Sequence, residues 1–334
     1  MPSTADLRGR TALVTGATGF LGAHVAEELV ARGATVLCPC RSGVLSLPPH
    51  DRLRPVRLDL LDRSGLARLV AAYDVDLIVH SAARDGTPED KRLRAGTMID
   101  ENVRMVSNVL DSARRGGVAD TVLVSSSDVY AGTVPWPVRE TEDHHTDMRF
   151  AQDGFYLSKV HAEVLAEQYA AEHGMRVHLP RPASIYGPGD DFGPRSLRLI
   201  PRLISRVRAG EEVEIWGSGE QTRSFVYVTD VVRAVLAMVE HPQHRVANIG
   251  TGEQVSVLEL ARLVGEALGR PVRIRTDPAR PEGRSSRNLD LTRMRQIDGT
   301  EPVLLREGLR RTVAWYLGSA AELADDLRDV PAVS

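Results

Sequence analysis

The first half of the chain alternates short apolar runs with longer segments whose apolar residues recur at helical spacing. Many of the short runs contain β-branched residues, which suits buried strands. The alternation predicts a parallel, doubly wound α/β sheet. The predicted strands are Thr11–Thr15, Ala34–Cys38, Pro55–Leu58, Asp76–His80, Thr121–Ser125 and Arg176–Leu179, and the main predicted helices are Phe20–Ala31, Met98–Arg115 and Phe155–His173.

The pattern changes after a loop rich in Gly, Pro and Asp at Gly187–Gly193. Shorter elements follow, and we predict two domains joined by a chain that crosses between them: a dinucleotide-binding domain over 1–186 and a smaller α/β lobe over 187–334. Ligands of open parallel sheets bind outside the carboxyl ends of the strands, so the smaller lobe is expected to hold the substrate. Its predicted elements are helices at Leu197–Arg208, Thr229–Glu240 and Val257–Leu268 and strands at Val213–Ile215 and Val246–Ile249.

Composition narrows the classes of function. The chain is 42% hydrophobic and 26% charged with a net charge of −3, and it has no basic patch for nucleic acid or a membrane surface. Its two cysteines, Cys38 and Cys40, provide neither a disulfide framework nor enough ligands for a metal, so we expect buried thiols and no metal. With no apolar leader and no run long enough to span a bilayer, we expect a cytoplasmic protein.

Lysine is rare in this chain. Lys91 and Lys159 are the only lysines among 42 basic residues. A lysine kept against such a bias is expected where arginine cannot do the same task. Lys91 lies in a stretch that looks exposed, and the sequence gives it no role.

A glycine turn follows the first predicted strand and opens the first predicted helix. Gly16 permits the tight turn, Gly19 lets the backbone approach a pyrophosphate, and Gly22 allows close packing of helix on strand. Backbone N–H groups and the helix dipole would then hold the phosphates of a dinucleotide.

The spacing Gly-x-x-Gly-x-x-Gly resembles that of the extended short-chain dehydrogenases/reductases, the NAD-dependent epimerase/dehydratase family, which modify nucleotide-linked sugars. The resemblance runs from about Gly9 to Tyr316. It implies a Rossmann-type sheet that binds NAD or NADP. The cofactor-binding residues it implies, beyond the three glycines, are Thr18, Phe20, Leu21, Asp59, Leu60, Ala82, Ala83, Asn102, Lys159, Pro182 and Ile185.

The choice between NAD and NADP depends on the residues after the second strand. Enzymes that prefer NAD usually carry an acid there, which binds the ribose diol. This chain has no acid at that place, and Arg41 could pair with a 2′-phosphate instead. The sequence therefore favours NADP slightly, the alternative being a solvated arginine.

The segment Val122–Tyr130 reads VLVSSSDVY and matches the strand that carries the family's catalytic hydroxyl. The match places the hydroxyl that bonds the C4 oxygen of the sugar at Ser126. Two residues on, related enzymes carry a Glu or a Cys that handles a carbon-bound proton, so Asp128 is a candidate acid or base. The alternative for Asp128 is a turn after the strand.

The family's second catalytic element is Tyr-x-x-x-Lys on a helix. Lys159 matches its lysine, but Phe155 stands in the tyrosine position and Tyr156 is one residue late. On a helix this displacement rotates a side chain by ~100°, so Tyr156 should point elsewhere. Three explanations stay open: Phe155 is an engineered change, another hydroxyl or carboxylate (Tyr156, Ser126 or Asp128) replaces the tyrosine, or the protein binds its ligands without catalysis.

Three further residues are expected to bind the substrate. The family resemblance matches Arg223 to the arginine that grips the substrate's diphosphate, a task that suits a guanidinium. Arg280 is expected to close over the nucleotide, and Ser184 stands where the family often has an asparagine. Some segments look most like the enzymes that make GDP-fucose, but the Cys and His pair of that group is missing, so that reaction is not predicted.

These features predict an enzyme that transfers hydride at C4 of a nucleoside-diphosphate sugar. It would be an epimerase or a 4-ketoreductase, the alternatives being a decarboxylase or a 4,6-dehydratase. A non-catalytic NAD(P)-binding sensor is the alternative from another class, because of Phe155. The family resemblance also implies a homodimer formed through the helices near Met98–Arg115 and Phe155–His173.

Overall fold

The computed structural model describes residues 7–130, 137–142, 153–193, 196, 198–241, 243–280 and 288–328. The chain divides into two compact units. Unit 1 comprises residues 1–183, 229–252 and 288–301, and unit 2 comprises residues 184–228, 253–287 and 302–334. Within the described residues, no helix combines the length and apolar character needed to cross a bilayer.

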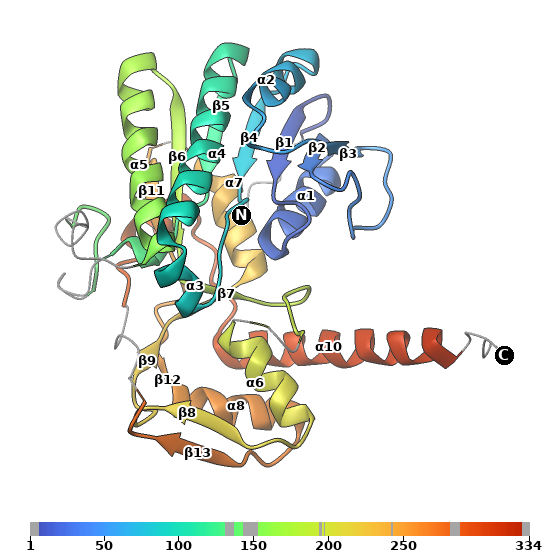
Figure 1. Ribbon diagram of the computed structural model, residues 1–334, viewed down its shortest axis with the longest axis vertical. Helices are drawn as coiled ribbons and strands as arrows, with labels where there is room; N and C mark the ends of the chain where they lie inside the picture. The colour runs from blue at the N-terminus through green and yellow to red at the C-terminus, as the bar shows by residue number, and fades with distance from the viewer. Residues whose placement is uncertain are drawn as a thin grey trace. The chain divides into compact units, whose positions relative to one another are not determined.

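Unit 1 is built on a parallel sheet of seven strands, counted over the described residues (Figure 1). The strand order reverses between β1 and β4, which is the switch point where open α/β sheets bind their ligands. The strands, in spatial order, are β11 (Val246–Ile249), β6 (Arg176–Pro182), β5 (Asp120–Leu123), β4 (Leu77–His80), β1 (Thr11–Thr15), β2 (Thr35–Cys40) and β3 (Leu53–Arg57).

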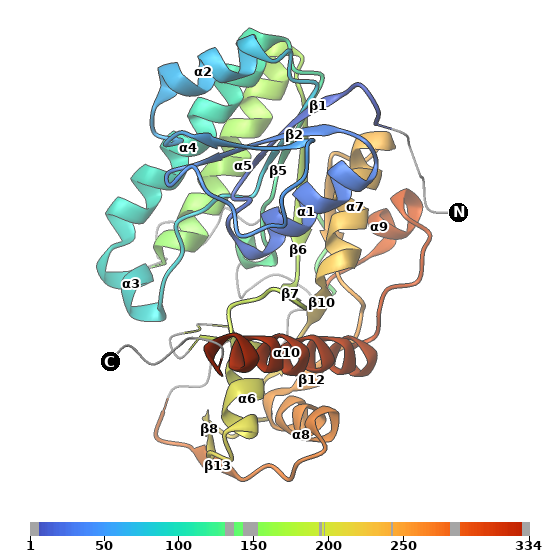
Figure 2. The same cartoon turned by 90° about the vertical axis from the view of Figure 1, so that its right-hand side faces the viewer.

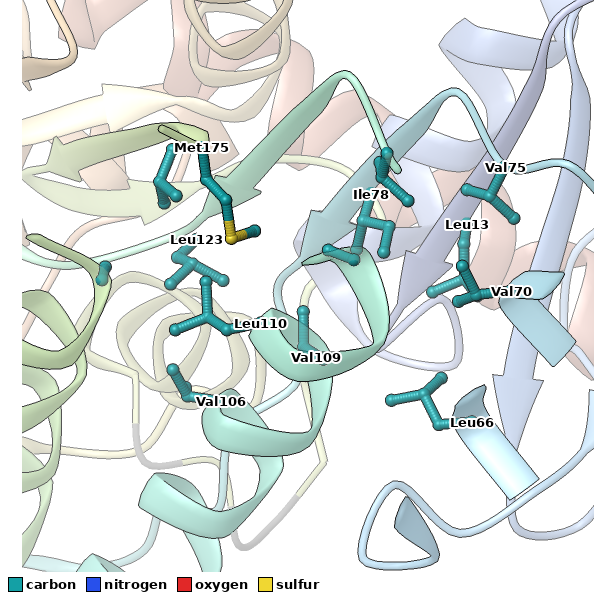
Figure 3. Close-up of a cluster of buried hydrophobic side chains, with 14 of the residues drawn as sticks. Leu13, Leu66, Val70, Val75, Ile78, Val106, Val109, Leu110, Leu123 and Met175 are labelled. Carbon is teal, nitrogen blue, oxygen red and sulfur yellow. The ribbon is translucent and has the colours of Figure 1, made fainter. Parts of the chain in front are cut away.

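Helices cover both faces of this sheet (Figure 2). On one face lie α2 (Arg63–Ala72), α4 (Ala95–Gly116) and α5 (Gly154–His173), and on the other lie α1 (Phe20–Ala31) and α7 (Val228–Glu240). The first face encloses a core in which Val109 and Leu110 of α4 pack with Ile78 and Leu123 of the strands (Figure 3). Unit 1 also contains α3 (Pro88–Leu93), the 3₁₀ turn η1 (Ser127–Val129) and α9 (Thr292–Ile297).

The fold confirms the predicted parallel sheet and corrects the place of two elements. Val246–Ile249 and Thr229–Glu240 were expected in the smaller lobe. Instead, β11 pairs in parallel with β6 at the edge of the large sheet, and most of α7 belongs to unit 1. After residues 184–228 of unit 2, the chain re-enters unit 1. There β11 pairs with β6, so that the buried backbone groups of the two strands bond each other.

Unit 2 is smaller, and its described residues form three pairs of short strands. These are β7 (Ser184–Tyr186) with β10 (Phe225–Tyr227), β8 (Val213–Trp216) with β13 (Ile274–Asp277), and β9 (Thr222–Arg223) with β12 (Val255–Ser256). Its helices are α6 (Leu199–Arg208), α8 (Val257–Leu268) and α10 (Leu305–Arg328). Ile204, Leu260 and Leu309, one from each helix, are fully buried in a common core.

Candidate active site

The glycine turn lies at the switch point of the sheet, directly after β1. Gly16 has a φ of +76°, which favours glycine, and a Cβ on it would lie 2.8 Å from the backbone nitrogen of Ala82. A Cβ on Gly22 would lie 2.3 Å from the carbonyl oxygen of Gly16. The turn therefore brings Gly16 and Ala82 together and lets α1 approach β1 as closely as the dinucleotide motif requires.

The N-terminus of α1 is suited to an anion. Gly19 is its N-cap and provides no side-chain cap, and the first turn contains no acidic residue. A Cβ on Gly19 would meet only the carbonyl oxygen of Gly16, at 3.3 Å, and otherwise open space. Thr18 is exposed beside it and Leu21 is buried under the turn. These residues fit a dinucleotide, whose pyrophosphate would lie against the N-terminus of α1.

Hydrogen bonds connect the carboxyl ends of β1 and β4 next to this turn. Thr15 Oγ1 and His80 Nδ1 lie 2.8 Å apart, and Ser81 donates a hydrogen bond to the carbonyl oxygen of Thr15. Ala82 N–H donates to Thr15 Oγ1, and Ala83 follows in an exposed position. Burial, and then the charge of Lys159, lower the pKa of His80 to about 3, so its ring is neutral at physiological pH.

The other predicted cofactor residues of unit 1 lie near the carboxyl ends of their strands. Arg41 is exposed immediately after β2. Asp59 follows β3, is exposed, and accepts a hydrogen bond from the backbone of Leu61. Leu60 is buried, and its carbonyl oxygen accepts a bond from Asn108. Pro182 is buried at the end of β6.

Ser126 and Asp128 lie just beyond β5. The oxygen of Ser126 accepts a hydrogen bond from the backbone N–H of Asp128 at 3.0 Å, and this bond caps η1. The proton of the Ser126 hydroxyl can therefore be donated elsewhere. Asp128 lies in the turn of η1, as its structural alternative predicted.

A buried ion pair contacts the segment Ser125–Tyr130 at both of its ends. Arg181 of β6 and Glu163 of α5 are both almost completely buried and bind each other. Ser125 donates to Glu163, and Arg181 donates to the hydroxyl of Tyr130. These contacts join β5, β6 and α5 next to the predicted catalytic residues. The sequence analysis did not anticipate them, because the partners are far apart in the chain and no local pattern shows that they are buried.

Lys159 lies on α5 facing the end of β5. Its Nζ donates a hydrogen bond to the carbonyl oxygen of Val124 at 2.7 Å. Burial lowers the pKa of Lys159 to about 8, although Asp85 and Glu163 act in the opposite direction. Val124 is two residues before Ser126, so the structure brings the two predicted catalytic residues to one place.

The ring of Phe155 lies close to both lysines of the chain. Lys91 Nζ is 4.4 Å from the centroid of its ring and Lys159 Nζ is 5.5 Å from it. The Lys91 side chain is only 21% exposed, and its ammonium lies 3.0 Å from Asp85 Oδ1. The sequence placed Lys91 in a stretch that looks exposed, whereas its side chain is partly buried and paired with Asp85.

Tyr156 points elsewhere, as the helical geometry predicted. Its side chain is only 3% exposed, whereas Phe155 is partly exposed. Asp153 caps α5 by accepting hydrogen bonds from the backbone of both residues, which fixes the first turn of the helix. Tyr156 is therefore buried on another side of the helix from the partly exposed Phe155.

Asn102 connects three segments of unit 1. Its Oδ1 accepts from the backbone N–H of Arg84 at 2.7 Å, and its Nδ2 donates to the carbonyl oxygen of Arg84 and to Ser158 Oγ, both at 3.0 Å. Ser158 in turn donates to the carbonyl oxygen of Phe155. Asn102 thus steadies the loop after β4 and the start of α5.

The substrate residues predicted from the sequence lie in unit 2. Arg223 is half-buried in β9 and donates to the carbonyl oxygen of Thr222, and burial lowers its pKa. Ser184 is exposed and Ile185 half-buried in β7. The guanidinium of Arg280 lies 5.2 Å from the centroid of the Trp216 ring, whose side chain is 49% exposed. An arginine stacked on an exposed indole offers a flat surface for a planar ligand group.

Comparisons with known proteins agree with this arrangement. The model of the NAD dependent epimerase/dehydratase family matches residues 12–250. The chain is 44% identical over 314 residues to dTDP-4-dehydro-6-deoxy-D-allose reductase of Streptomyces bikiniensis, covering 92% of this chain and 96% of that protein.

Solved structures show the same fold. The UDP-glucose 4-epimerase of Thermotoga maritima, solved with UDP-glucose, is 28% identical with a TM-score of 0.81, covering 93% of this chain and 99% of that one. MoeE5 in complex with UDP-glucuronic acid and NAD is 30% identical with a TM-score of 0.79, covering 93% and 100%. The chain therefore belongs to the NAD-dependent epimerase/dehydratase family and is an NAD(P)-dependent enzyme of the extended short-chain dehydrogenase/reductase type.

Proposed function

We propose that this enzyme is a 4-ketoreductase that reduces the C4 ketone of a dTDP-4-dehydro-6-deoxyhexose with NADPH. The observation that carries the proposal is the 44% identity, over nearly the full length of both chains, to a reductase of a dTDP-4-dehydro-6-deoxy sugar. The NADPH preference rests on the exposed Arg41 after β2, where an acid that would bind the ribose diol of NAD is missing.

Each proposed role follows from a position described above. The glycine turn and the N-terminus of α1 would hold the cofactor's pyrophosphate, and Lys159 would bind the nicotinamide ribose. When bound, the reduced nicotinamide supplies the hydride. Ser126 would donate its hydroxyl proton in a hydrogen bond to the C4 oxygen, since its own oxygen is engaged by Asp128 N–H.

Unit 2 would hold the dTDP portion of the substrate. Arg223 would bind the diphosphate through its planar fork of N–H donors. The Arg280–Trp216 pair would lie against the base. A ketone reduction needs one proton for the C4 oxygen and none at carbon, so Asp128 would act as an acid or base only if the enzyme also epimerises its substrate.

The decisive experiment supplies the purified enzyme with dTDP-4-dehydro-6-deoxyglucose and its C3 epimer, each with NADPH or NADH. Loss of absorbance at 340 nm together with a new C4 carbinol proton in the NMR spectrum is the expected result. The same reaction in D₂O tests Asp128, because deuterium at C3 or C5 of the product would reveal an epimerisation. Cofactor binding without any turnover would contradict the proposal and favour a sensor.

The UDP- and GDP-linked 4-dehydro sugars are the controls for nucleotide choice. We expect them to be reduced at least 10-fold more slowly in kcat/KM, a difference of about 1.4 kcal/mol in transition-state binding. The expected homodimer and cytoplasmic location remain predictions, and sedimentation equilibrium tests the first.

A further inference from the structure

The only two lysines of the chain lie against the same phenylalanine ring. Arginine provides the other 40 of the 42 basic residues, yet Lys91 and Lys159 come to 4.4 and 5.5 Å from the ring centroid of Phe155. Either cation could stack on an aromatic ring, and arginine does so more often. What lysine can do and arginine cannot is release a proton under ordinary conditions. The placement therefore indicates proton chemistry at this ring.

Hydrogen bonds fix both the start of α3, which carries Lys91, and the loop before it, which carries Asp85. Thr87 and Asp90 form a capping box at the start of α3, with Asp90 N–H donating to Thr87 Oγ1 at 2.9 Å and Thr87 N–H donating to Asp90 Oδ2 at 3.1 Å. On the other side, Asn102 binds both backbone groups of Arg84. Asp85, which pairs with Lys91, lies between these two fixed points.

The same amide also fixes the ring that Lys91 approaches. Asn102 donates to Ser158 Oγ, and Ser158 donates to the carbonyl oxygen of Phe155 at 2.8 Å. The lysine and the ring are therefore positioned by one hydrogen-bonded framework rather than by a chance surface contact.

Phe155 creates a need for a proton donor. It stands where the family's tyrosine supplies a hydroxyl, and the neighbouring Tyr156 is buried on another side of the helix. Lys159 is already bound to the carbonyl oxygen of Val124 and has a proposed task at the ribose. Lys91 remains, with 21% of its side chain exposed and a flexible chain of four methylenes.

We propose that Lys91 is the general acid that protonates the C4 oxygen of the substrate, in place of the tyrosine hydroxyl that Phe155 lacks. This proposal rests on the proposed ketoreductase function. As hydride forms the new C4–H bond, the electron pair of the C=O π bond moves to the oxygen. That oxygen forms an O–H bond while an N–H bond of the Lys91 ammonium breaks. Lys91 is left as a neutral amine and regains a proton from solvent beside Asp85, whose side chain is 53% exposed.

The test compares Lys91→Arg with Lys91→Met, each with and without Phe155→Tyr. Lys91→Arg keeps the positive charge, the ion pair with Asp85 and the stacking on Phe155, but a guanidinium does not release its proton. We expect kcat to fall 10²–10⁴-fold in both single variants, the range for loss of a general acid. We expect Phe155→Tyr to restore at least a tenth of wild-type kcat in both backgrounds.

Two measurements separate this role from a structural one. The thermal midpoint and the NADPH dissociation constant should stay at wild-type values in Lys91→Arg. Arg92→Gln is the matched control, because Arg92 is exposed on the same short helix and its loss removes one positive charge. That variant should keep wild-type turnover.

The outcomes are distinct. The assignment is supported if the wild type turns over the substrate, Lys91→Arg lowers kcat by 10²-fold or more, and Phe155→Tyr restores kcat in that variant. If Lys91→Arg keeps its activity, or if the added tyrosine restores nothing, Lys91 is not the acid while the ketoreductase function stands. If the wild type reduces no dTDP-4-dehydro sugar, the function itself is wrong, and the assignment falls with it.

Discussion

Lys159 of α5 binds the carbonyl oxygen of Val124, 2.7 Å away, and so ties the helix to the end of the central strand β5. The bond holds the ammonium two residues from Ser126, at the carboxyl edge of the sheet. Burial lowers the pKa of this ammonium to about 8. The charge that is proposed to hold the nicotinamide ribose is therefore lost at mildly alkaline pH.

The first prediction is a pH dependence of cofactor binding. In the wild type, the NADPH dissociation constant should rise several-fold between pH 7 and pH 9.5, because the neutral amine of Lys159 is a weaker donor. Lys159→Met should bind NADPH more weakly at pH 7 and should lose this part of the pH dependence. Isothermal titration calorimetry at four pH values measures both.

Loss of the folded state at alkaline pH does not explain a rise in the NADPH dissociation constant. The pKa of Lys159 is about 8 in the folded protein, against the ordinary lysine value of 10.5, which we take for the unfolded chain. Between about pH 8 and pH 10.5 this group therefore binds more protons in the unfolded chain than in the folded protein. This group's contribution to the free energy of unfolding therefore increases as pH rises from about 8 to 10.5. A pH dependence that persists unchanged in Lys159→Met would contradict the assignment.

The second prediction concerns Asn102. Replacement by Leu removes three hydrogen bonds and leaves the backbone groups of Arg84 without these partners. We expect a loss of about 2–4 kcal/mol in the free energy of unfolding, since each buried group left unpaired costs about 1–3 kcal/mol. Amide hydrogen exchange at Arg84 and along the start of α5 should accelerate.

Asn102→Asp is the finer comparison. The aspartate can still accept from Arg84 N–H but cannot donate to the Arg84 carbonyl or to Ser158. If exchange at Arg84 and the activity of both variants match the wild type, Asn102 does not position this loop.

Much of unit 1 could be predicted because its signals are local. Thr11–Thr15 is a compact apolar run, and the glycines after it are required by a turn whose geometry depends on neighbouring residues. Helix Phe20–Ala31 was likewise predicted with the bounds that the structure gives it. The family motif placed Lys159 and Ser126 correctly at the carboxyl edge of the sheet, since both follow from recognised local patterns.

The missed features depend on contacts between distant parts of the chain. The pairing of β11 with β6 joins two strands that are separated in the chain by the first segment of unit 2 and by α7, and no local pattern encodes it. The contact between Lys91 and Phe155 depends on the packing of α3 against α5. The ion pair of Arg181 and Glu163 also joins a strand to a helix, and a charged residue in sequence gives no sign of being buried.

The third prediction tests the cofactor preference. Arg41→Ala should raise the KM for NADPH about 10-fold or more and change the KM for NADH little, because only NADPH carries the 2′-phosphate that the guanidinium would bind. Arg57→Ala is a control, since Arg57 is also exposed at the end of a neighbouring strand and its loss changes the net charge equally. Equal effects of Arg41→Ala on both cofactors would exclude 2′-phosphate recognition by this residue.

The fourth prediction separates the packing of the glycine turn from its chemistry. In Gly22→Ala the added Cβ would lie 2.3 Å from the carbonyl oxygen of Gly16, so the backbone of the turn must shift. Overpacking of this kind costs about 1–3 kcal/mol, and displacement of the turn should also weaken NADPH binding at least 10-fold.

Gly96→Ala is the matched control for this change. Gly96 lies in α4, where an added Cβ would meet no neighbouring atom within 4 Å. Gly96 is the second residue of α4, so the gain in stability should be smaller than the roughly 0.5–1 kcal/mol expected in the middle of a helix. Urea unfolding and NADPH titration of both variants provide the comparison. If Gly22→Ala binds NADPH as tightly as the wild type does, the close approach of α1 to β1 is not needed for the cofactor.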